Sequence, residues 1–483
     1  MNIADPIHRH ARSDPHATAV IRRRGDTASY RDLDRTIDAL AQRARDSGLA
    51  PGDVAVIAIA STYRLLVWSL ALARLGVASA AASLPPEHAD ACLAERGREP
   101  VGRADVTLVE AEWTETPAAA ASVPPVPAHD DGTAICRIFA TSGTTGTPKH
   151  VAISHDLIGR RVAARQHTVL PDEPSVLMCL IGLSTTFGFV SILRTLWAGG
   201  RLVLARKPDE IIAAIDRHRV RCLVTAPATL ADVLAALPPA RGPLSSLARI
   251  EVGGSPLPSR LCRDVRMRLC ANVDSCYGSV EAGAVAGAPM TAVEGRPGAV
   301  GFLLPGVLVQ AVDDDGRPLP PGVEGELRMR SDSGVRGYVG GGPTDAGAFE
   351  GGWFCSGDVG SVADDGMLLV TGRKGDVINS SGQKIDPQAI EDVLLSMSSI
   401  REAAAFGVPD TSGVTQIWAA IVADADLDVA VLDAVCRNRL QNRAPKMVLN
   451  MASLPRNEGG KVMRDELVAM ALAASRNPPG AGR

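Results

Sequence analysis

Residues 135–155 read ICRIFATSGTTGTPKHVAISH. The run from Ile135 to Ala140 is apolar and predicts a buried strand, and His150 to Ile153 predicts a second short strand. Between them, Thr141 to Lys149 contain four Thr, one Ser, two Gly, one Pro and one Lys. Such a loop offers hydroxyl and backbone N–H donors and one fixed positive charge, which are the groups that bind a polyphosphate. The composition also fits a linker, but strands on both sides favour a phosphate-binding loop.

The spacing of this loop differs from that of the common P-loop, in which four residues separate two glycines and a lysine follows directly. Here two residues separate Gly143 from Gly146, and Lys149 lies three positions further on. A P-loop kinase, which would release ADP, is therefore disfavoured. The segment SGTTGTPK, residues 142–149, instead resembles the phosphate loop of the adenylate-forming superfamily, which includes acyl-CoA synthetases, acyl-carrier ligases and firefly luciferase.

The resemblance implies that this loop holds the phosphates of ATP. The residues concerned are Thr141, Ser142, Gly143, Thr144, Thr145, Gly146 and Lys149. Thr145 is also expected among the catalytic residues and as a ligand of Mg²⁺, a hard ion that seeks oxygen ligands.

The bulk properties exclude several other classes of protein. The chain has 483 residues, 46% of them hydrophobic and 22% charged, which is typical of a soluble globular protein with two or three cores. A formal charge of −4 gives no reason to expect nucleic acid as a partner. No apolar run is long enough to span a membrane, and the N-terminus lacks a secretory signal. Nine scattered cysteines without a Cys-x-x-Cys pair indicate neither zinc nor disulfides, so we expect a cytoplasmic protein.

The order of predicted elements indicates an α/β fold. Strand and helix patterns alternate through most of the chain, which predicts a parallel sheet covered by helices. From Val300 to Met329 short strands and turns predict a β-rich subdomain, and alternation restarts in a smaller α+β unit after Gly372-Arg373. We therefore expect a large N-terminal domain, residues 1–373, that binds ATP and the acid. Residues 374–483 are expected to form a small mobile lid domain.

A second motif, DSCYGSVE at residues 274–281, resembles the Tyr-Gly-x-Thr-Glu motif of the superfamily. The resemblance implies that Tyr277 packs against adenine and that Glu281, as a catalytic residue, holds Mg²⁺ together with Thr145. Val280 stands where the motif has a Thr, so a hydroxyl directed at the α-phosphate is missing. Further residues expected at the nucleotide are Gly254, Ser255, Ser275, Cys276, Gly278 and Ser279.

A third motif, WFCSGD at residues 353–358, resembles Trp-x-x-Thr-Gly-Asp of the same superfamily, with Ser356 replacing Thr. A carboxylate accepts hydrogen bonds from two neighbouring hydroxyls, so Asp358 suits the 2′ and 3′ oxygens of ribose. The resemblance also implies that Arg373, in the segment GRKGD at residues 372–376, contacts ribose or phosphate. The hinge position of the superfamily falls on Gly375, and glycine tolerates the large backbone change that a hinge needs.

Near the C-terminus, LPRNEGGKVMR at residues 454–464 resembles Pro-x-Thr-x-Ser-Gly-Lys-x-x-Arg, with Gly459 replacing Ser. In the superfamily this lysine bridges the carboxylate substrate and the phosphate during adenylation, so Lys461 is the expected catalytic lysine. The lid is then expected to rotate, which withdraws Lys461 and brings the loop at Gly382 to the site for thiol transfer.

The implied reaction is activation of a carboxylic acid to acyl-AMP with release of pyrophosphate, followed by acyl transfer to a thiol. Amino-acid-activating relatives place an Asp where Thr186 falls, so an acid without an α-ammonium group is expected; Thr185 replaces the His that acyl-CoA synthetases often carry. The pocket candidates Phe187, Phe189, Gly253, Gly254 and Ser255 suit a neutral acyl or aryl group.

Three alternatives stay open at this point. Coenzyme A is the first expectation for the acceptor, but a phosphopantetheinyl carrier protein or an amine fits the same chemistry. The basic residues Arg437, Arg439, Arg443 and Lys446 suit either the phosphates of coenzyme A or an acidic carrier, and they also fit an ordinary solvated face. The replacements Val280, Gly459 and His150, which stands where a Gly usually follows the loop lysine, are compatible with a weakened relative that only binds.

Overall fold

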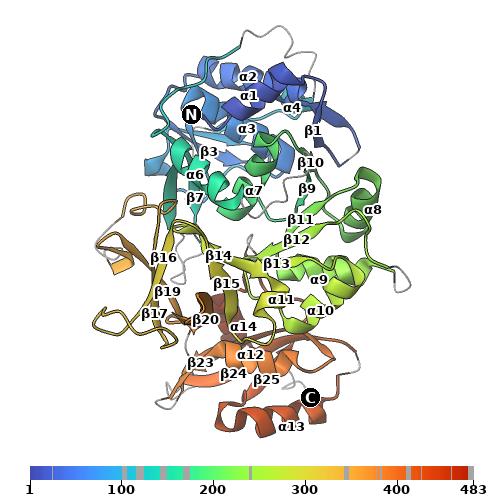
Figure 1. The fold of residues 1–483 in the computed structure, drawn as a ribbon, viewed down its shortest axis with the longest axis vertical. Helices are drawn as coiled ribbons and strands as arrows, with labels where there is room; N and C mark the ends of the chain where they lie inside the picture. Colours follow the sequence, from blue (N-terminus) through green and yellow to red (C-terminus); the bar gives the residue numbers. More distant parts are fainter. Residues whose placement is uncertain are drawn as a thin grey trace.

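The computed structural model describes residues 1–23, 25–100, 106–115, 125–141, 149–166, 175–238, 242–341, 347–376, 378–380, 383–409, 415–425, 427–457 and 460–476. It has an α/β fold with a large N-terminal part and a small C-terminal α+β part, which lie at opposite ends of the long axis (Figure 1). The predicted fold class is therefore confirmed. No helix among the described residues combines the length and the apolar character needed to cross a membrane.

A six-stranded sheet carries the predicted phosphate loop. Its order is β6 (Val106–Leu108), β5 (Ala91–Ala94), β3 (Val54–Ala58), β4 (Ala78–Ala80), β7 (Ile135–Ala140) and β8 (His150–Ser154). All neighbours pair in parallel except β7 and β8, which are antiparallel. The two strands predicted on either side of the loop thus pair with each other, and the loop connects their adjacent ends.

The second sheet is much larger and has a parallel part and an antiparallel part. Its parallel part runs β10 (Arg201–Val203), β9 (Val176–Cys179), β11 (Cys222–Thr225), β12 (Arg249–Gly253) and β13 (Val273–Ser279), with the hairpin β1 (Thr18–Ile21) and β2 (Thr27–Ser29) at one edge. Its antiparallel part runs β14 (Gly283–Pro289), β15 (Ala299–Leu303), β20 (Met367–Arg373), β19 (Trp353–Val362), β17 (Gly325–Ser331) and β16 (Val307–Val312), with β18 (Phe349–Glu350) beside β19. The predicted β-rich part therefore continues the parallel sheet through β13 and β14.

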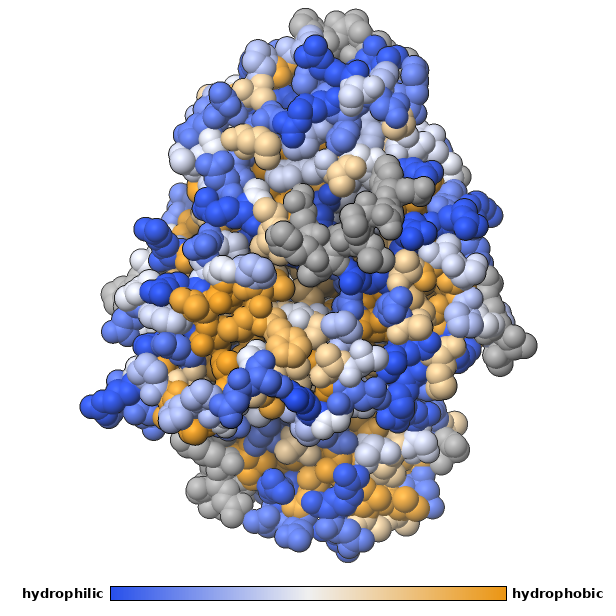
Figure 2. Space-filling view, viewed as in Figure 1, coloured by the Kyte–Doolittle hydropathy of each residue, from blue (hydrophilic) through white to orange (hydrophobic). Residues whose placement is uncertain are grey.

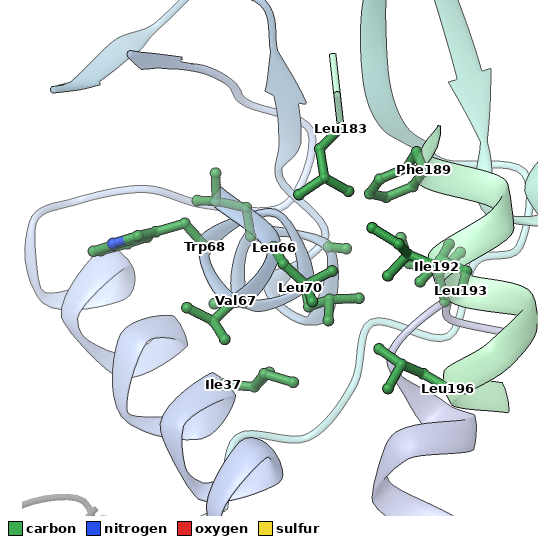
Figure 3. Close-up of a cluster of buried hydrophobic side chains, with 14 of the residues drawn as sticks. Ile37, Leu66, Val67, Trp68, Leu70, Leu183, Phe189, Ile192, Leu193 and Leu196 are labelled. Carbon is green, nitrogen blue, oxygen red and sulfur yellow. The ribbon is translucent and has the colours of Figure 1, made fainter. Parts of the chain in front are cut away.

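The main core lies where helices pack between the two sheets. Helix α3 (Thr62–Leu75) is apolar nearly all round and is buried against α2 (Tyr30–Asp46) and α7 (Thr186–Trp197) (Figure 3). The labelled residues of α7, with Phe189 among them, face Leu66 and Leu70 of α3, whereas Trp68 points to the opposite side of α3. Arg74 of α3 is buried, and its charge is compensated by ion pairs with Asp34 at 2.7 Å and Asp38 at 2.6 Å.

The other helices of the N-terminal part pack around the two sheets. They are α1 (Asp5–Ser13), α4 (Glu112–Glu115), α6 (His155–Gln166), α8 (Pro208–His218), α9 (Pro227–Ala236), α10 (Ser259–Arg268) and α11 (Met290–Val293), with a short 3-10 turn η1 (Pro86–His88). Figure 2 shows hydrophobic residues gathered across the middle of the same face, over the region of β14 and β15.

The C-terminal part has its own sheet and its own cores. The elements are β21 (Ile378–Ser380), β22 (Gln383–Ile385), α12 (Pro387–Leu395), β23 (Ile400–Pro409), β24 (Thr415–Ala423), α13 (Val429–Leu440), η3 (Gln441–Arg443), β25 (Met447–Asn450) and α14 (Arg464–Arg476). Its two buried clusters contain only residues from Ile378 onward, and the clusters of the N-terminal part contain only earlier residues.

Candidate active site

The neck of the predicted phosphate loop is closed by a backbone hydrogen bond. The N–H of Thr141 donates to the carbonyl oxygen of Lys149 at 2.7 Å, directly beyond the paired ends of β7 and β8. Thr141 is buried and Lys149 is half-buried. The other predicted loop residues, namely Ser142, Gly143, Thr144, Thr145 and Gly146, lie outside the described residues.

Lys149 and Glu281 meet at a tyrosine that the sequence analysis did not single out. The hydroxyl of Tyr338 donates to Oε1 of Glu281 at 2.9 Å, and the ammonium nitrogen of Lys149 lies 4.8 Å from the centre of the Tyr338 ring. Glu281 is buried. An exposed cation over an aromatic ring contributes roughly 0.5–1 kcal/mol. The only sequence signal for Tyr338 is its place as one of four tyrosines, within a glycine-rich segment.

A buried arginine fixes the backbone of Glu281. Arg161 of α6 donates from Nη2 to the carbonyl oxygens of Val280 and Glu281, and from Nε to that of Ser333. Burial lowers the pKa of Arg161 to about 10, although the carboxylate of Glu281 acts in the opposite direction. Val280, which replaces the Thr of the motif, packs against the main core, so its side chain has a structural role here.

Two predicted nucleotide residues, Tyr277 and Arg373, hydrogen-bond to the carboxylate of a third, Asp358. Asp358 of β19 is buried and pairs across the sheet with Arg373 of β20, whose Nε donates to its Oδ1 at 2.6 Å. The hydroxyl of Tyr277 from β13 donates to Oδ2 at 2.5 Å. Burial and the Asp358 carboxylate together raise the pKa of Tyr277, so the phenol stays protonated. The N–H of Asp358 in turn donates to the hydroxyl of Ser356.

The C-terminal part brings Lys461 to this cluster. Lys461 is half-buried, and its pKa is lowered first by burial and then by the positive charge of Arg373. Asp376 and Asp358 act in the opposite direction, so the ammonium lies within electrostatic range of both. Two hydrogen bonds close its loop. The N–H of Asn457 donates to the carbonyl oxygen of Lys461, and the N–H of Lys461 donates to Oδ1 of Asn457.

The Lys461 loop also touches the N-terminal part directly. A Cβ placed on Gly460 would lie 3.0 Å from the Cβ of Ala226, at the start of α9. Arg260 of α10 donates to the carbonyl oxygen of Ser398. The C-terminal part therefore contacts the N-terminal part both at the Lys461 loop and at Ser398.

The remaining predicted residues lie along β12 and β13. Gly254 follows β12 with a φ of +92°, a backbone conformation that favours glycine, and Ser255 comes next. Ser275, Cys276, Gly278 and Ser279 are all on β13. Ser279 accepts a hydrogen bond from the N–H of Ala282, which shapes the turn into Glu281.

Two residues that differ from the superfamily pattern, His150 and Thr185, have local structural roles. His150 is buried, its ring nitrogen lies 3.2 Å from the hydroxyl of Ser83, and its carbonyl oxygen accepts from Val339. Burial, and secondarily His88, lower its pKa, so the ring is neutral near pH 7. Thr185 caps the N-terminus of α7, where its hydroxyl accepts from the N–H of Gly188.

Comparison with known protein families identifies the family of this chain. Residues 7–339 match the family described as AMP-binding enzyme. The chain belongs to this family. The match covers the six-stranded sheet and the large sheet as far as β17, and it ends just after Tyr338, so it includes Glu281 and the predicted phosphate loop.

Relatives of this AMP-binding enzyme cover nearly its whole length. It is 31% identical over 494 residues to a feruloyl-CoA synthase from Amycolatopsis sp, covering 96% of this chain and 97% of that protein. It is 29% identical over 492 residues to the salicyl-AMP ligase / salicyl-S-ArCP synthetase of Mycobacterium tuberculosis, covering 91% and 85%. Among solved structures, the amide bond synthetase McbA from Marinactinospora thermotolerans is 26% identical with a TM-score of 0.78, covering 97% and 99%.

The donor groups of this AMP-binding enzyme fit Mg²⁺ held mainly by a substrate. Within the described ranges there is no group of three or more His, Cys, Asp or Glu side chains that could hold a metal ion. Mg²⁺ usually binds one or two carboxylates together with substrate phosphates and water. The buried Glu281 carboxylate, held beside Lys149 through Tyr338, matches that pattern.

Proposed function

We propose that this protein is an AMP-forming acid–thiol ligase that activates a carboxylic acid with ATP and transfers the acyl group to coenzyme A. The observation that carries the proposal is that the Lys461 loop docks on the N-terminal part at Ala226, while Tyr277 and Arg373 hold the Asp358 carboxylate. A feruloyl-CoA synthase among the relatives supports coenzyme A as the acceptor.

In the proposed site, Asp358 accepts hydrogen bonds from the ribose hydroxyls of ATP, and Arg373 holds the Asp358 carboxylate in place. Tyr277 presents its ring to adenine while its hydroxyl fixes the ring orientation. The predicted phosphate loop, residues 141–149, would bind the β- and γ-phosphates. Glu281 and Thr145 would hold Mg²⁺, which neutralises charge on the phosphates when bound.

In the first half-reaction, a carboxylate oxygen of the acid attacks the α-phosphorus of ATP. The bond from that phosphorus to the bridging oxygen breaks, and pyrophosphate leaves with the bonding electron pair. Two anions must meet, so preorganised positive charge is needed where the transition state spreads negative charge. Lys461 supplies that charge between the acid and the α-phosphate, and Lys149 supplies it at the leaving group.

We propose that the chain divides at the segment 374–376 into the domains 1–373 and 374–483, with Gly375 as the hinge. Two ion pairs flank this glycine and tie it to different parts. Lys374 pairs with Glu326 of β17 at 2.8 Å, and Asp376 pairs with Arg464 of α14 at 3.2 Å. Rotation about Gly375 would withdraw Lys461 and bring the loop at Gly382 to the acyl-AMP for attack by the thiol.

The test is to incubate the purified protein with ATP, Mg²⁺ and a panel of aliphatic, aryl and dicarboxylic acids. The expected result is acid-dependent release of pyrophosphate and AMP, with acyl-AMP trapped by hydroxylamine, and acyl-CoA on addition of coenzyme A. Release of ADP would contradict the ligase assignment. No product with any acid of the panel would support a relative that binds but does not react.

A second acceptor is favoured by two relatives. The salicyl-S-ArCP synthetase points to a carrier-protein thiol, and McbA points to an amine. Comparing free coenzyme A, a pantetheinylated carrier protein and a simple amine as acceptors at equal acyl-AMP concentration separates the three. The proposal is wrong if the carrier or the amine is acylated and coenzyme A is not.

A further inference from the structure

A small cavity lies beside the proposed nucleotide site. It has a volume of about 150 Å³, similar to that of an engineered protein cavity that binds benzene. Its lining combines small residues with charged ones: Arg165, Arg249, Glu251, Asp274, Ser275, Cys276, Ala286, Gly287, Ala288, Pro289 and Leu304. The volume therefore suits one aromatic ring rather than a long chain.

The position of the cavity connects it to the reacting centre. It begins at Cys276, the residue before Tyr277, and continues along β13 only as far as Asp274. Two residues of a strand span about 7 Å, so the cavity is short. Next to the lining residue Cys276, an added Cβ on Gly253 would lie 2.9 Å from the Cys276 carbonyl oxygen and 2.9 Å from the Phe187 ring. An acid whose carboxylate faces Lys461 would place its ring here.

The far wall of the cavity is a buried ion network. Glu251 of β12 accepts from Arg194 of α7 at 2.9 Å and, more closely, from Arg165 of α6. Burial would raise the pKa of Glu251, but the two arginines outweigh it and lower the pKa to about 2. Glu251 and Arg194 are thus both charged in the folded protein.

Arg165 is further fixed by neutral groups. Its Nη1 donates to the hydroxyl of Ser191 at 3.1 Å, and its guanidinium lies 4.5 Å from the centre of the Phe187 ring. At the lower end, Arg249 pairs with Asp274 at 2.6 Å. The charged residues of the lining are therefore two arginines and two carboxylates, and Arg194 pairs with Glu251 from outside the lining.

We propose, as a deepening of the ligase function above, that the acid is a single-ring aromatic acid with a hydroxyl group on the ring. In this proposal the network of Arg165, Glu251 and Arg194 determines that specificity. A hydroxyl can exchange hydrogen bonds with the ionised wall, whereas an apolar tail would cover charged groups without satisfying them. A long alkyl chain would also extend beyond a cavity of about 150 Å³.

The experiment compares 4-hydroxybenzoate, benzoate and octanoate by acid-dependent pyrophosphate release. The wild-type protein is expected to favour 4-hydroxybenzoate over benzoate at least tenfold in kcat/KM, and to use octanoate least. The triple variant R165M/R194M/E251L replaces the network with apolar residues of similar size, a change that other buried ion networks tolerate. In this variant the preference for the hydroxyl is expected to fall below threefold, with the KM for ATP unchanged.

The variant E251Q tests the same wall while it keeps the shape of the side chain. It leaves the two arginines without their carboxylate, so a ring with a second carboxylate, terephthalate, is expected to gain at least tenfold relative to benzoate. Equal use of octanoate and 4-hydroxybenzoate by the wild type, or an unchanged selectivity in both variants, would overturn the inference. Failure of the ligase function itself looks different, because then no acid releases pyrophosphate.

Discussion

The hydroxyl of Tyr277 donates a hydrogen bond of 2.5 Å to Asp358, a residue 81 positions later in the chain. Arg373 donates to the other oxygen of the same carboxylate at 2.6 Å. One buried carboxylate thus joins β13, β19 and β20, and it orients an aromatic ring and a guanidinium at the same time. The position of each group depends on the other two.

Replacing Asp358 by Asn is expected to lower kcat/KM for ATP by about 10- to 100-fold. A hydrogen bond to a charged group contributes roughly 1.5–3 kcal/mol, and the amide can no longer accept fully from Arg373 and Tyr277. The measurement is pyrophosphate release at varied ATP. Tyr277→Phe serves as the control, because it keeps the ring and removes one hydrogen bond, so a loss smaller than that of Asp358→Asn is expected.

Replacing Lys461 by Ala is expected to lower the rate of adenylation by about two to three orders of magnitude, the scale for losing one preorganised donor. Transfer from preformed acyl-AMP to the thiol should be nearly unchanged, since Lys461 acts only in the first half-reaction. Both steps are measured separately, by pyrophosphate release and by acyl-CoA formation. An unchanged rate of pyrophosphate release would remove Lys461 from the mechanism.

The lowered pKa of Lys461 predicts a pH dependence. Burial and the neighbouring Arg373 disfavour the ammonium, so it loses its proton at a lower pH than an exposed lysine does. Adenylation is therefore expected to decline on the alkaline side, starting below the usual lysine pKa of about 10.4. In Lys461→Arg the rate should be lower but this decline should disappear, because arginine stays protonated. The check is the pH profile of the single-turnover adenylation rate in both proteins.

The sequence predicted those parts that depend on local chemistry. The bounds of helix α3 follow from local signals, because Ser61 caps its start and Gly76, with a φ of +83°, ends it. Tyr277, Asp358, Arg373 and Lys461 were identified because each lies in a short segment that resembles a motif of the superfamily. The structure brings these four together, and their roles in the reaction stay predictions.

Other parts of the site depend on contacts between distant segments and left no local pattern. Arg161 meets the backbone of Glu281 across 120 positions, and Glu251 meets Arg165 across 86. An isolated arginine in a helix reads as a solvated residue, so neither contact was predicted. The antiparallel pairing that joins the β-rich part to the parallel sheet was missed for the same reason, because strand pairing is decided by packing over the whole chain.

Arg161 is expected to act as a positioning residue for Glu281. Arg161→Met removes the donors to three carbonyl oxygens while it keeps an apolar stem of similar length. The Mg²⁺ concentration needed for half-maximal pyrophosphate release is expected to rise about tenfold or more. The matched control is Arg160→Met on the same helix, which loses one exposed hydrogen bond to Asp332 and should leave the Mg²⁺ dependence unchanged. Equal Mg²⁺ dependence in both variants would contradict this role.

The contact between Gly460 and Ala226 predicts a pair of compensating substitutions. Gly460 has a φ of +79°, and an added Cβ would press on the Cβ of Ala226 at 3.0 Å, so Gly460→Ala should keep Lys461 away from the Asp358 cluster. Adenylation is expected to fall several-fold, and Ala226→Gly in the same protein should restore much of it because it removes the opposing atom. Gly366→Ala is the control for backbone strain alone, since Gly366 has a φ of +80° and nothing within 4 Å of an added Cβ. If Gly366→Ala reduces adenylation as much as Gly460→Ala does, or if Ala226→Gly restores nothing, the docking of this loop on α9 is not what positions the lysine.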